Sequence, residues 1–170
     1  MSGFVRLVDA ICRGMLWISA MMLTAMMLVV LADVITRALF RLTDGSFDLT
    51  FNGGIELVRF ALLFAILYAL PWCVDRSQVV VDLFTESLSE RKKAFLETIC
   101  FFGYSLLATA MSTKFWSTVG HSSMSGETSQ DLMFPMSYIY AATLFGTIML
   151  AVRSLLVAGS RFRVVLGWQA

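Results

Sequence analysis

Four long stretches without a charged residue divide this chain of 170 residues. They cover residues 14–32, 60–74, 98–113 and 132–152, with lengths of 19, 15, 16 and 21. A helix needs roughly 20 mostly apolar residues to cross a hydrocarbon core of about 30 Å. The first and last stretches reach that length, and the middle two reach it with their flanking turns, where long charged side chains can extend to the interface. The pattern therefore predicts four membrane-spanning helices.

Proline and turn residues refine these stretches into spans with approximate bounds. The four expected spans are residues 14–35, 54–74, 95–113 and 134–157. Pro71 should kink or end the last turn of the second span, and Pro135 suits the first turn of the fourth. Segments 43–54 and 114–131 are rich in turn-forming residues and lack hydrophobic periodicity. We expect both segments to be external loops.

A different pattern occupies the connection between the second and third spans. Its apolar residues recur at helical spacing, and its acidic residues fall on the other face: Val80, Leu83, Phe84 and Leu88 against Asp82, Glu86 and Glu90. This predicts a short amphipathic helix over about 79–91, lying along the cytoplasmic interface. Because its polar face is acidic, docking on a protein partner explains it better than adhesion to anionic lipid. An alternative is a helical elbow that only covers its own bundle.

Composition supports an all-α membrane protein with one domain over residues 1–170. Hydrophobic residues make up 58% of the chain and charged residues 15%, against about 25% charged in soluble domains. The gaps between spans, roughly 20 residues at most, leave no room for a separate soluble domain. The first span is too long for the apolar region of a signal peptide, and no small-x-small cleavage site follows it before Asp33. We therefore expect it to be retained.

The distribution of Lys and Arg predicts the orientation. The two terminal segments and the second connection carry nine of these 13 residues, and the first and third connections carry four. The positive-inside rule then places both termini and the second connection in the cytoplasm. No basic cluster interleaved with aromatic residues occurs, which argues against a nucleic-acid partner.

The chain offers little for catalysis, cofactors or metals. Cys12, Cys73 and Cys100 are isolated, which excludes a paired-cysteine redox enzyme and favours their role as small hydrophobic residues. His121 is the only histidine, so a bis-histidine haem site cannot form. No metal-binding or phosphate-binding motif occurs. We therefore expect no catalytic residue, no cofactor and no metal site.

Two oppositely charged pairs lie at the external ends of spans. Asp33 and Arg37 are four residues apart, and Glu56 and Arg59 are three apart, so each pair can meet on one helical face. Ionisable groups in a membrane tend to face protein and find partners. The pairs either bind a transported ion or fix a helix interface, or they simply neutralise each other at the boundary. Mutual neutralisation is favoured over ion binding.

The span centres contain only scattered Ser and Thr as polar residues. A transporter core needs broken helices or a polar cavity near the midplane, and a small exporter or channel needs a polar stripe. The sequence therefore indicates a scaffold. A homo-oligomeric small membrane structural protein, or an exporter, remains the alternative function.

Three groups of motifs resemble the small membrane subunit of tripartite ATP-independent periplasmic (TRAP) transporters. The first is D-V-I-T-R at 33–37 with E-L-V-R-F at 56–60, and the second is D-R-S-Q-V-V-V-D-L at 75–83 with E-S-L-S-E-R at 86–91. The third is G-E-T-S-Q-D-L-M-F-P at 126–135. The similarity covers about residues 30–156. Gln78 stands where members of this family often carry a histidine.

The resemblance implies a non-catalytic subunit in the bacterial inner membrane. Its implied partners are a large TRAP membrane subunit, which holds the transport path and sodium sites, and a periplasmic substrate-binding protein that delivers organic acids. The implied role is to widen the membrane scaffold and to help dock the binding protein. We predict a subunit interface containing Asp33, Arg37, Glu56, Arg59, Asp82 and Phe84. We predict a docking surface for the binding protein containing Asp44, Asp48, Lys114, Glu127 and Asp131.

Overall fold

The structure, a computed structural model, describes residues 2–43, 53–74 and 90–165. Four helices fill these ranges: α1 (Ser2–Leu42), α2 (Gly54–Cys73), α4 (Glu90–Ser125) and α5 (Met136–Val165). Each is long and apolar enough to cross a membrane. The predicted all-α fold with four spanning helices is confirmed, and the chain is a multi-pass membrane protein.

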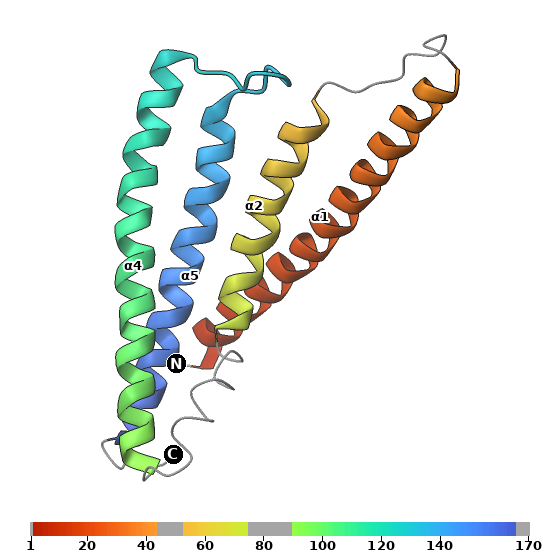
Figure 1. Ribbon diagram of the computed structural model, residues 1–170. Coiled ribbons are helices and arrows are strands. Elements are labelled where there is room, and N and C mark those ends of the chain that lie inside the picture. The colour runs from red at the N-terminus through yellow and green to blue at the C-terminus, as the bar shows by residue number, and fades with distance from the viewer. Residues whose placement is uncertain (1, 44–52, 75–89, 166–170) are drawn as a thin grey trace.

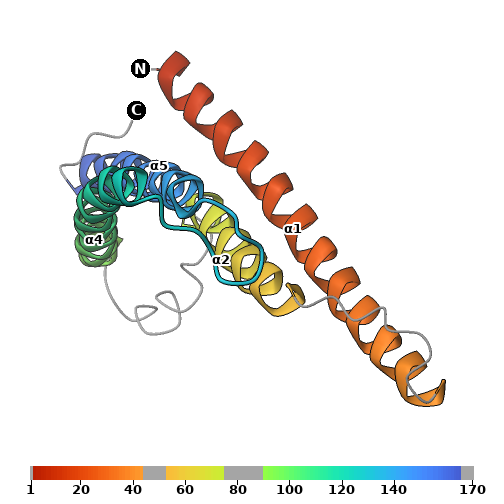
Figure 2. The ribbon, with the colours of Figure 1, turned by 90° about the horizontal axis from the view of Figure 1, so that it is seen from above.

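The helices form a row rather than a closed bundle. α4 packs along α5, α5 packs along α2, and α2 packs along α1, which also touches α5 at one end. Figure 2 shows this order from above, with α1 diverging from the arc of the other three helices. Consequently α1 lies at one end of the row and α4 lies at the other end.

Both ends of the described chain lie on the same side of the row. α1 and α4 run in one direction, and α2 and α5 run in the other (Figure 1). We call the side that holds residues 2 and 165 the inner end, and the side that holds the α4–α5 connection the outer end. A chain with an even number of spans returns to the side from which it started.

Helix lengths exceed the predicted spans. α1 has 41 residues and α4 has 36, so at 1.5 Å per residue they measure about 60 and 54 Å. Both are much longer than the hydrocarbon core, and a long helix is accommodated by tilting or by projecting from the bilayer. Figure 1 shows α1 strongly inclined against α4 and α5.

The expected loop over 114–131 was wrong for most of its length. α4 continues through this segment to Ser125, and Gly126 follows it with φ +66°, a common helix-ending conformation. Serine and threonine side chains in this part of α4 bond to carbonyls of their own helix, as Ser117 and Thr118 do to Lys114. The apolar span therefore ends near Lys114, where the composition becomes polar, but the helix continues to Ser125.

The other turn signals agree with the structure. Pro71 lies in the last turn of α2, which ends at Cys73, and α5 begins directly after Pro135. The predicted interfacial helix over 79–91 lies outside the described residues, except for its last two positions, which belong to α4.

Candidate functional site

Ion pairs join the helices at the inner end. Arg153 of α5 is 8% exposed, and its Nη2 lies 3.1 Å from Oδ1 of Asp9 in α1. Asp9 also lies 3.8 Å from Arg13, whose guanidinium stacks 5.3 Å from the ring centre of Trp72 in α2. This chain of contacts ties α1, α2 and α5 together where the three helices meet.

A second ion pair, with a buried carboxylate and a partly exposed arginine, joins α4 to α5 at the same end. Glu97 is 4% exposed and its Oε2 lies 3.4 Å from Nε of Arg161. A buried carboxylate needs a partner, because an uncompensated charge in an apolar surrounding is costly. The inner end is therefore fixed by charges on α1, α4 and α5 and by the contact of Arg13 with Trp72 of α2.

These pairs were not predicted from the sequence. Asp9, Glu97, Arg153 and Arg161 lie far apart in the chain, and local spacing cannot bring them together. The available signal was positional and incomplete: Glu97 and Arg153 each border one of the uncharged stretches, and charges at such borders tend to find partners. Their position does not identify Arg161 as the partner of Glu97 or Asp9 as the partner of Arg153.

Glu56 holds the outer end together. Its carboxylate accepts hydrogen bonds from the backbone N–H groups of Gln130, Asp131 and Leu132, at 3.3, 2.9 and 3.0 Å. Successive N–H groups in a turn form a concave anion-binding site. Figure 1 shows the α4–α5 connection reaching over to the start of α2, where this contact forms.

The α4–α5 connection is itself ordered by backbone hydrogen bonds. Ser129 N–H donates to the carbonyl of Phe134 at 2.9 Å, and Met136 N–H donates to the carbonyl of Glu127 at 3.0 Å. Together with the Glu56 contact, these bonds hold the connection against the start of α2 and the start of α5.

Within the row, polar side chains and one glycine set the helix contacts. Ser112 of α4 donates to Oγ1 of Thr147 in α5 at 3.0 Å, and Tyr68 of α2 donates to the carbonyl of Ala142 in α5 at 3.1 Å. A Cβ atom on Gly146 would lie 2.7 Å from a side-chain carbon of Leu67, so the glycine permits the close approach of α2 and α5. Small residues and interhelical hydrogen bonds are the usual means of helix association in lipid.

The outer half of α1 has almost no neighbour within the chain. Its inner half buries Val8, Cys12, Met15 and Ser19 against the other helices. Beyond Ser19 no residue of α1 is buried. The most apolar window of α1 is 6% buried, against 39% for α5. Among the described residues, this outer half of α1 is the longest helical run without a buried residue.

Of the two predicted charge pairs, one forms in the structure and the other does not. Arg37 Nε lies 2.9 Å from Oδ2 of Asp33, so this predicted contact forms, on the uncovered outer half of α1. The predicted contact between Glu56 and Arg59 was wrong, because Glu56 bonds instead to the α4–α5 connection. Among the described residues, no ion pair joins exposed Arg59 to a carboxylate.

The residues predicted to dock a binding protein are only partly described. Lys114 lies exposed within α4, and Glu127 and Asp131 lie exposed in the α4–α5 connection at the outer end. Asp44 and Asp48 lie outside the described residues, as do Asp82 and Phe84 of the predicted subunit interface. The described members are therefore distributed over one helix and the loop that follows it.

No metal-binding cluster accompanies these contacts in the described residues. Over 2–43, 53–74 and 90–165, no three His, Cys, Asp or Glu side chains gather as a metal site would require. Cys12 is buried, whereas Cys73 and Cys100 are exposed along the helices, and none forms a disulfide. His121 is exposed near the end of α4.

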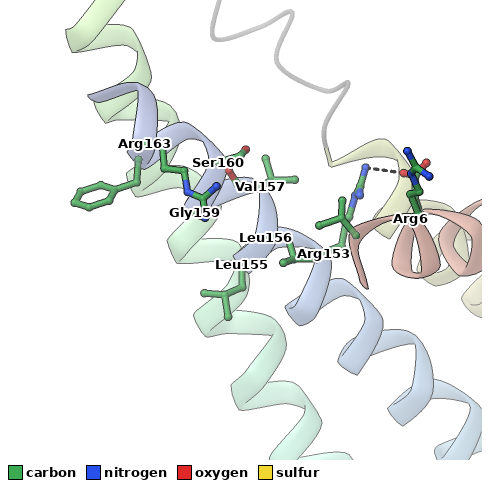
Figure 3. A pocket seen from close by; sticks show the side chains of 11 residues that line it. Arg6, Arg153, Leu155, Leu156, Val157, Gly159, Ser160 and Arg163 are labelled. Carbon is green, nitrogen blue, oxygen red and sulfur yellow. Dashed lines mark hydrogen bonds and ion pairs between the residues drawn. The ribbon is translucent and has the colours of Figure 1, made fainter. Parts of the chain in front are cut away.

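Two cavities lie at the inner end, along α5. The larger, of about 810 Å³, lies between α1 and α5 and includes Arg6, Asp9, Arg153 and Arg163 in its lining (Figure 3). The smaller, of about 490 Å³, is an apolar groove between α4 and α5. Both lie at the inner end of the row, away from the α4–α5 connection.

Comparison with known proteins gives one match. The model of the family described as "Tripartite ATP-independent periplasmic transporters, DctQ component" matches residues 26–164. Searches of curated proteins and of solved structures found no match to this chain. The match covers α1 from residue 26 onwards, all of α2 and α4, and α5 up to residue 164.

Proposed function

Because this chain belongs to the DctQ family of TRAP transporter components, we propose that it is the small membrane subunit that braces the large, transporting subunit. The assembly would take up an organic acid with sodium, delivered by a periplasmic binding protein. In this assignment the chain itself carries neither solute nor cation and performs no catalysis. The motifs that suggested the family from sequence lie within the matched residues.

The uncovered outer half of α1 is the observation that most supports a bracing role. In lipid, the hydrophobic effect does not drive an apolar helix to pack against its neighbours or to separate from them. A spanning helix that its own chain contacts only at one end, and that carries a charge pair in its exposed part, fits a surface made for another protein. A row of helices, unlike a closed bundle, also leaves room for a partner to pack along it.

We propose that Asp33, Arg37 and Arg59 contribute to the interface with the large subunit. Asp33 and Arg37 already neutralise each other, which lowers the cost of burying them against a partner. Arg59 is exposed near the start of α2 and would pair with a carboxylate of the large subunit. Asp82 and Phe84 belong to the same proposal on the grounds of sequence alone.

Glu56 takes an indirect part in this interface. Because its carboxylate is already engaged by three amides, it supports the start of α2 rather than offering a contact to a partner. In this proposal Glu56 positions the helix from which Arg59 projects.

The outer end of the row would meet the binding protein. The polar continuation of α4 beyond Lys114 adds about 16 Å of helix past the uncharged stretch. Exposed Glu127 and Asp131 lie next to the end of this helix. We propose that these residues, with Asp44 and Asp48 in the first connection, contact the binding protein on its arrival.

The proposed orientation follows from the charges. Arg6, Arg13, Arg153, Arg161 and Arg163 all belong to the inner end, which would face the cytoplasm of a bacterial inner membrane. The outer end would then face the periplasm, as binding-protein docking requires.

Replacement of one arginine tests the interface. The Arg59→Ala variant, co-expressed with the large TRAP subunit, should retain less of that subunit on purification through a tag on this chain. Lys114→Ala is the matched control, because it should leave pairing intact and reduce uptake only when the binding protein is present. Undiminished pairing of Arg59→Ala would remove Arg59 from the interface.

Reconstitution tests the function as a whole. Vesicles that hold this chain, the large subunit and the binding protein should take up solute with a sodium gradient, and vesicles that lack the large subunit should not. Solute transport by the chain alone would overturn the proposal and favour an exporter. A stable homo-oligomer that excludes the large subunit would favour a structural protein.

A further inference from the structure

We propose that a polar face on the outer part of α4 lies against lipid head groups, so that the bilayer surface is lowered beside this helix. The polar face consists of exposed Thr113, Lys114, Ser117 and His121. Neither the family nor the bracing role assigns a lipid contact to these residues. The lipid contact stands without them, and only the naming of this leaflet as periplasmic rests on the proposed orientation.

Contacts between α4 and α5 fix the depth of the polar face. Ser112 donates to Oγ1 of Thr147 at 3.0 Å, and further toward the outer end the rings of Phe115 and Tyr140 lie 6.5 Å apart. Because the two helices are antiparallel, each step outward along α4 is matched by a step back along α5 toward its first residue (Figure 1). The polar face of α4 therefore lies beside the first three turns of α5.

The level of Ser112 also corresponds to the middle of α2. A Cβ atom on Gly146 would lie 2.7 Å from a side-chain carbon of Leu67, so Leu67 lies at nearly the same level as Thr147 and Ser112. Leu67 is the central residue of the uncharged stretch 60–74. This level therefore approximates the centre of the hydrocarbon core that α2 crosses.

The first charge outward of this level lies nearer to the centre on α4 than on its neighbours. Lys114 is two residues, about 3 Å, outward of Ser112, whereas Arg59 is eight residues, about 12 Å, outward of Leu67. The part of α5 that lies outward of this level is uncharged over its whole length of about 16 Å. A flat bilayer that fits α2 and α5 would therefore immerse Lys114.

Extension of the lysine side chain does not remove this mismatch. The outer boundary of the hydrocarbon core lies about 15 Å from its centre. The methylenes of Lys114 carry its ammonium group roughly 6 Å, so the charge would end about 6 Å short of that boundary. Over residues 2–43, 53–74 and 90–165, no carboxylate forms an ion pair with Lys114. Such a charge is costly in hydrocarbon, and a local deformation of the bilayer relieves the cost.

Exposed aromatic residues give an independent indication of the boundary. Trp and Tyr side chains favour the interface between hydrocarbon and water. Trp116, 73% exposed, lies about 6 Å outward of Ser112, whereas Tyr138, 66% exposed, lies about 14 Å outward of Thr147. The aromatic residues thus place the boundary about 8 Å nearer to the centre at α4 than at α5, close to the difference of about 9 Å between Lys114 and the first charge of α2.

The apolar part of α4 is displaced inward to a similar extent. The uncharged stretch 98–113 has its midpoint near Ser105, about 10 Å inward of Ser112. Still further inward, the side chains of Phe95 and Ile99 are 52% and 53% exposed. A bilayer that meets α4 further inward covers these apolar side chains and leaves the polar face among head groups, because lipid adjusts to the hydrophobic length that a helix presents.

Nitroxide labels on single cysteines measure the depth of chosen positions in a bilayer. The full-length chain would carry Cys73→Ala and Cys100→Ala, which remove the exposed thiols, and would keep buried Cys12 as the background. Each labelled variant is reconstituted in vesicles of dioleoyl-phosphatidylcholine. Collisions of the label with a water-soluble nickel complex report contact with water, and collisions with oxygen report contact with hydrocarbon.

Ser117→Cys on α4 and Ala141→Cys on α5 form the matched pair, because both small side chains are exposed and lie at nearly the same level. The label at Ser117 should collide with the nickel complex several-fold more often than the label at Ala141. Glu127→Cys in the α4–α5 connection gives the reference for water, and Leu107→Cys, deeper on α4, gives the reference for hydrocarbon.

Two results of this comparison would overturn the proposal. If the label at Ser117 is shielded like that at Leu107, hydrocarbon covers the polar face. If the labels at Ser117 and Ala141 are equally open to the nickel complex, the bilayer surface is level across the two helices.

A double variant tests whether the polar face itself lowers the bilayer. With the label at Thr113→Cys, Lys114→Leu combined with His121→Leu should reduce nickel collisions several-fold, because the ionisable groups no longer exclude hydrocarbon. Glu127→Leu removes a charge at the outer end away from this face and should leave the label at Thr113 unchanged. Unchanged collisions in the double variant, with the helical circular dichroism of the parent chain, would contradict the proposal.

The alternative occupant of the polar face is the large subunit. If the label at Ser117 is open to the nickel complex in the isolated chain but loses contact with both nickel and oxygen in the co-purified assembly, the face is a protein interface and the lipid assignment is wrong. Unchanged nickel collisions in the assembly support the lipid assignment. Because pairing is measured separately by co-purification, failure of the lipid contact is distinguishable from failure of the bracing role.

Discussion

The two ends of α1 experience opposite surroundings within one helix. Near the inner end, Asp9 meets buried Arg153, and Cys12 and Ser19 are buried against the other helices. Near the outer end, Asp33 meets only Arg37, four residues along the same helix, and the apolar side chains around this pair are uncovered. The uncovered outer half is at least as apolar as the inner half, so hydrophobicity does not decide which half packs. In lipid, the deciding features are buried charges, small residues and interhelical hydrogen bonds.

The largest difference between the two ends should appear on removing an aspartate from each. Asp9→Ala removes the carboxylate that pairs with Arg153, whose side chain is 10% exposed, and should lower the free energy of unfolding by about 2 kcal/mol. This figure is below the usual loss for a fully buried pair because the Asp9 side chain is 36% exposed. Unfolding by SDS in mixed micelles, followed by circular dichroism, measures it.

Asp33→Ala is the matched control for this prediction. Both aspartates precede an arginine by four residues in α1, but the Asp33 pair is exposed, with Arg37 at 58%, and its loss should cost about 0.5 kcal/mol. Equal losses at the two positions would contradict the contrast between the ends.

The contact between α2 and α5 should be the next most sensitive. Gly146→Leu places a side chain where Leu67 and Tyr68 already lie, and should cost about 2 kcal/mol through overpacking, offset in part by the better helix propensity of leucine. The same unfolding assay applies. Gly103→Leu brings the same gain in propensity without a clash, so the difference between the two variants isolates the contact. A Gly146→Leu variant as stable as Gly103→Leu would show that α2 and α5 do not approach closely.

One interhelical hydrogen bond in the α4–α5 pair should have a small effect. Ser112→Ala removes the bond to Thr147 and should cost about 0.6 kcal/mol, the typical value for such bonds in membranes. Ser117→Ala removes a hydroxyl that bonds only to its own helix, and should change the free energy of unfolding by less. A larger loss at Ser117 would reverse the assignment of the α4 face that meets α5.

The most local effect should come from the contact between Glu56 and the α4–α5 connection. Glu56→Gln should speed hydrogen exchange at the amides of Asp131 and Leu132 while leaving the unfolding transition nearly unchanged, because a neutral amide accepts weaker hydrogen bonds than a carboxylate. Glu127→Gln, an exposed change in the same connection, should leave those amides protected. Unaltered exchange in Glu56→Gln would mean that the carboxylate does not hold the connection.

Local sequence patterns predicted the features that depend only on residues close together in the chain. Charge-free length identified all four spanning helices, and a separation of four residues identified the Asp33–Arg37 contact. The Glu56–Arg59 spacing failed because amides more than 70 residues away bind the carboxylate better than a side chain on the same helix can. No local rule anticipates a partner at that distance.

The order of the helices in the row could not be predicted either. The spans are apolar on most of their faces, so periodicity does not identify the face that packs. The features that decide are single residues such as Gly146, Glu97 and Arg153, whose role depends on which helix lies opposite. The helical continuation of α4 past Lys114 does not follow from composition, because polar residues suit an exposed helix as well as a loop.

A photo-crosslinking amino acid on the outer half of α1 tests the central claim most directly. Leu28 is 61% exposed and lies in the part of α1 that its own chain leaves uncovered. Placed there in cells that also express the large TRAP subunit and the binding protein, the crosslinker should give a covalent adduct with the large subunit. The same crosslinker at Leu106, 63% exposed on α4 at the far end of the row, should give less of that adduct. An adduct between two copies of this chain, or none with the large subunit, would contradict the account of α1 as the surface that braces its partner.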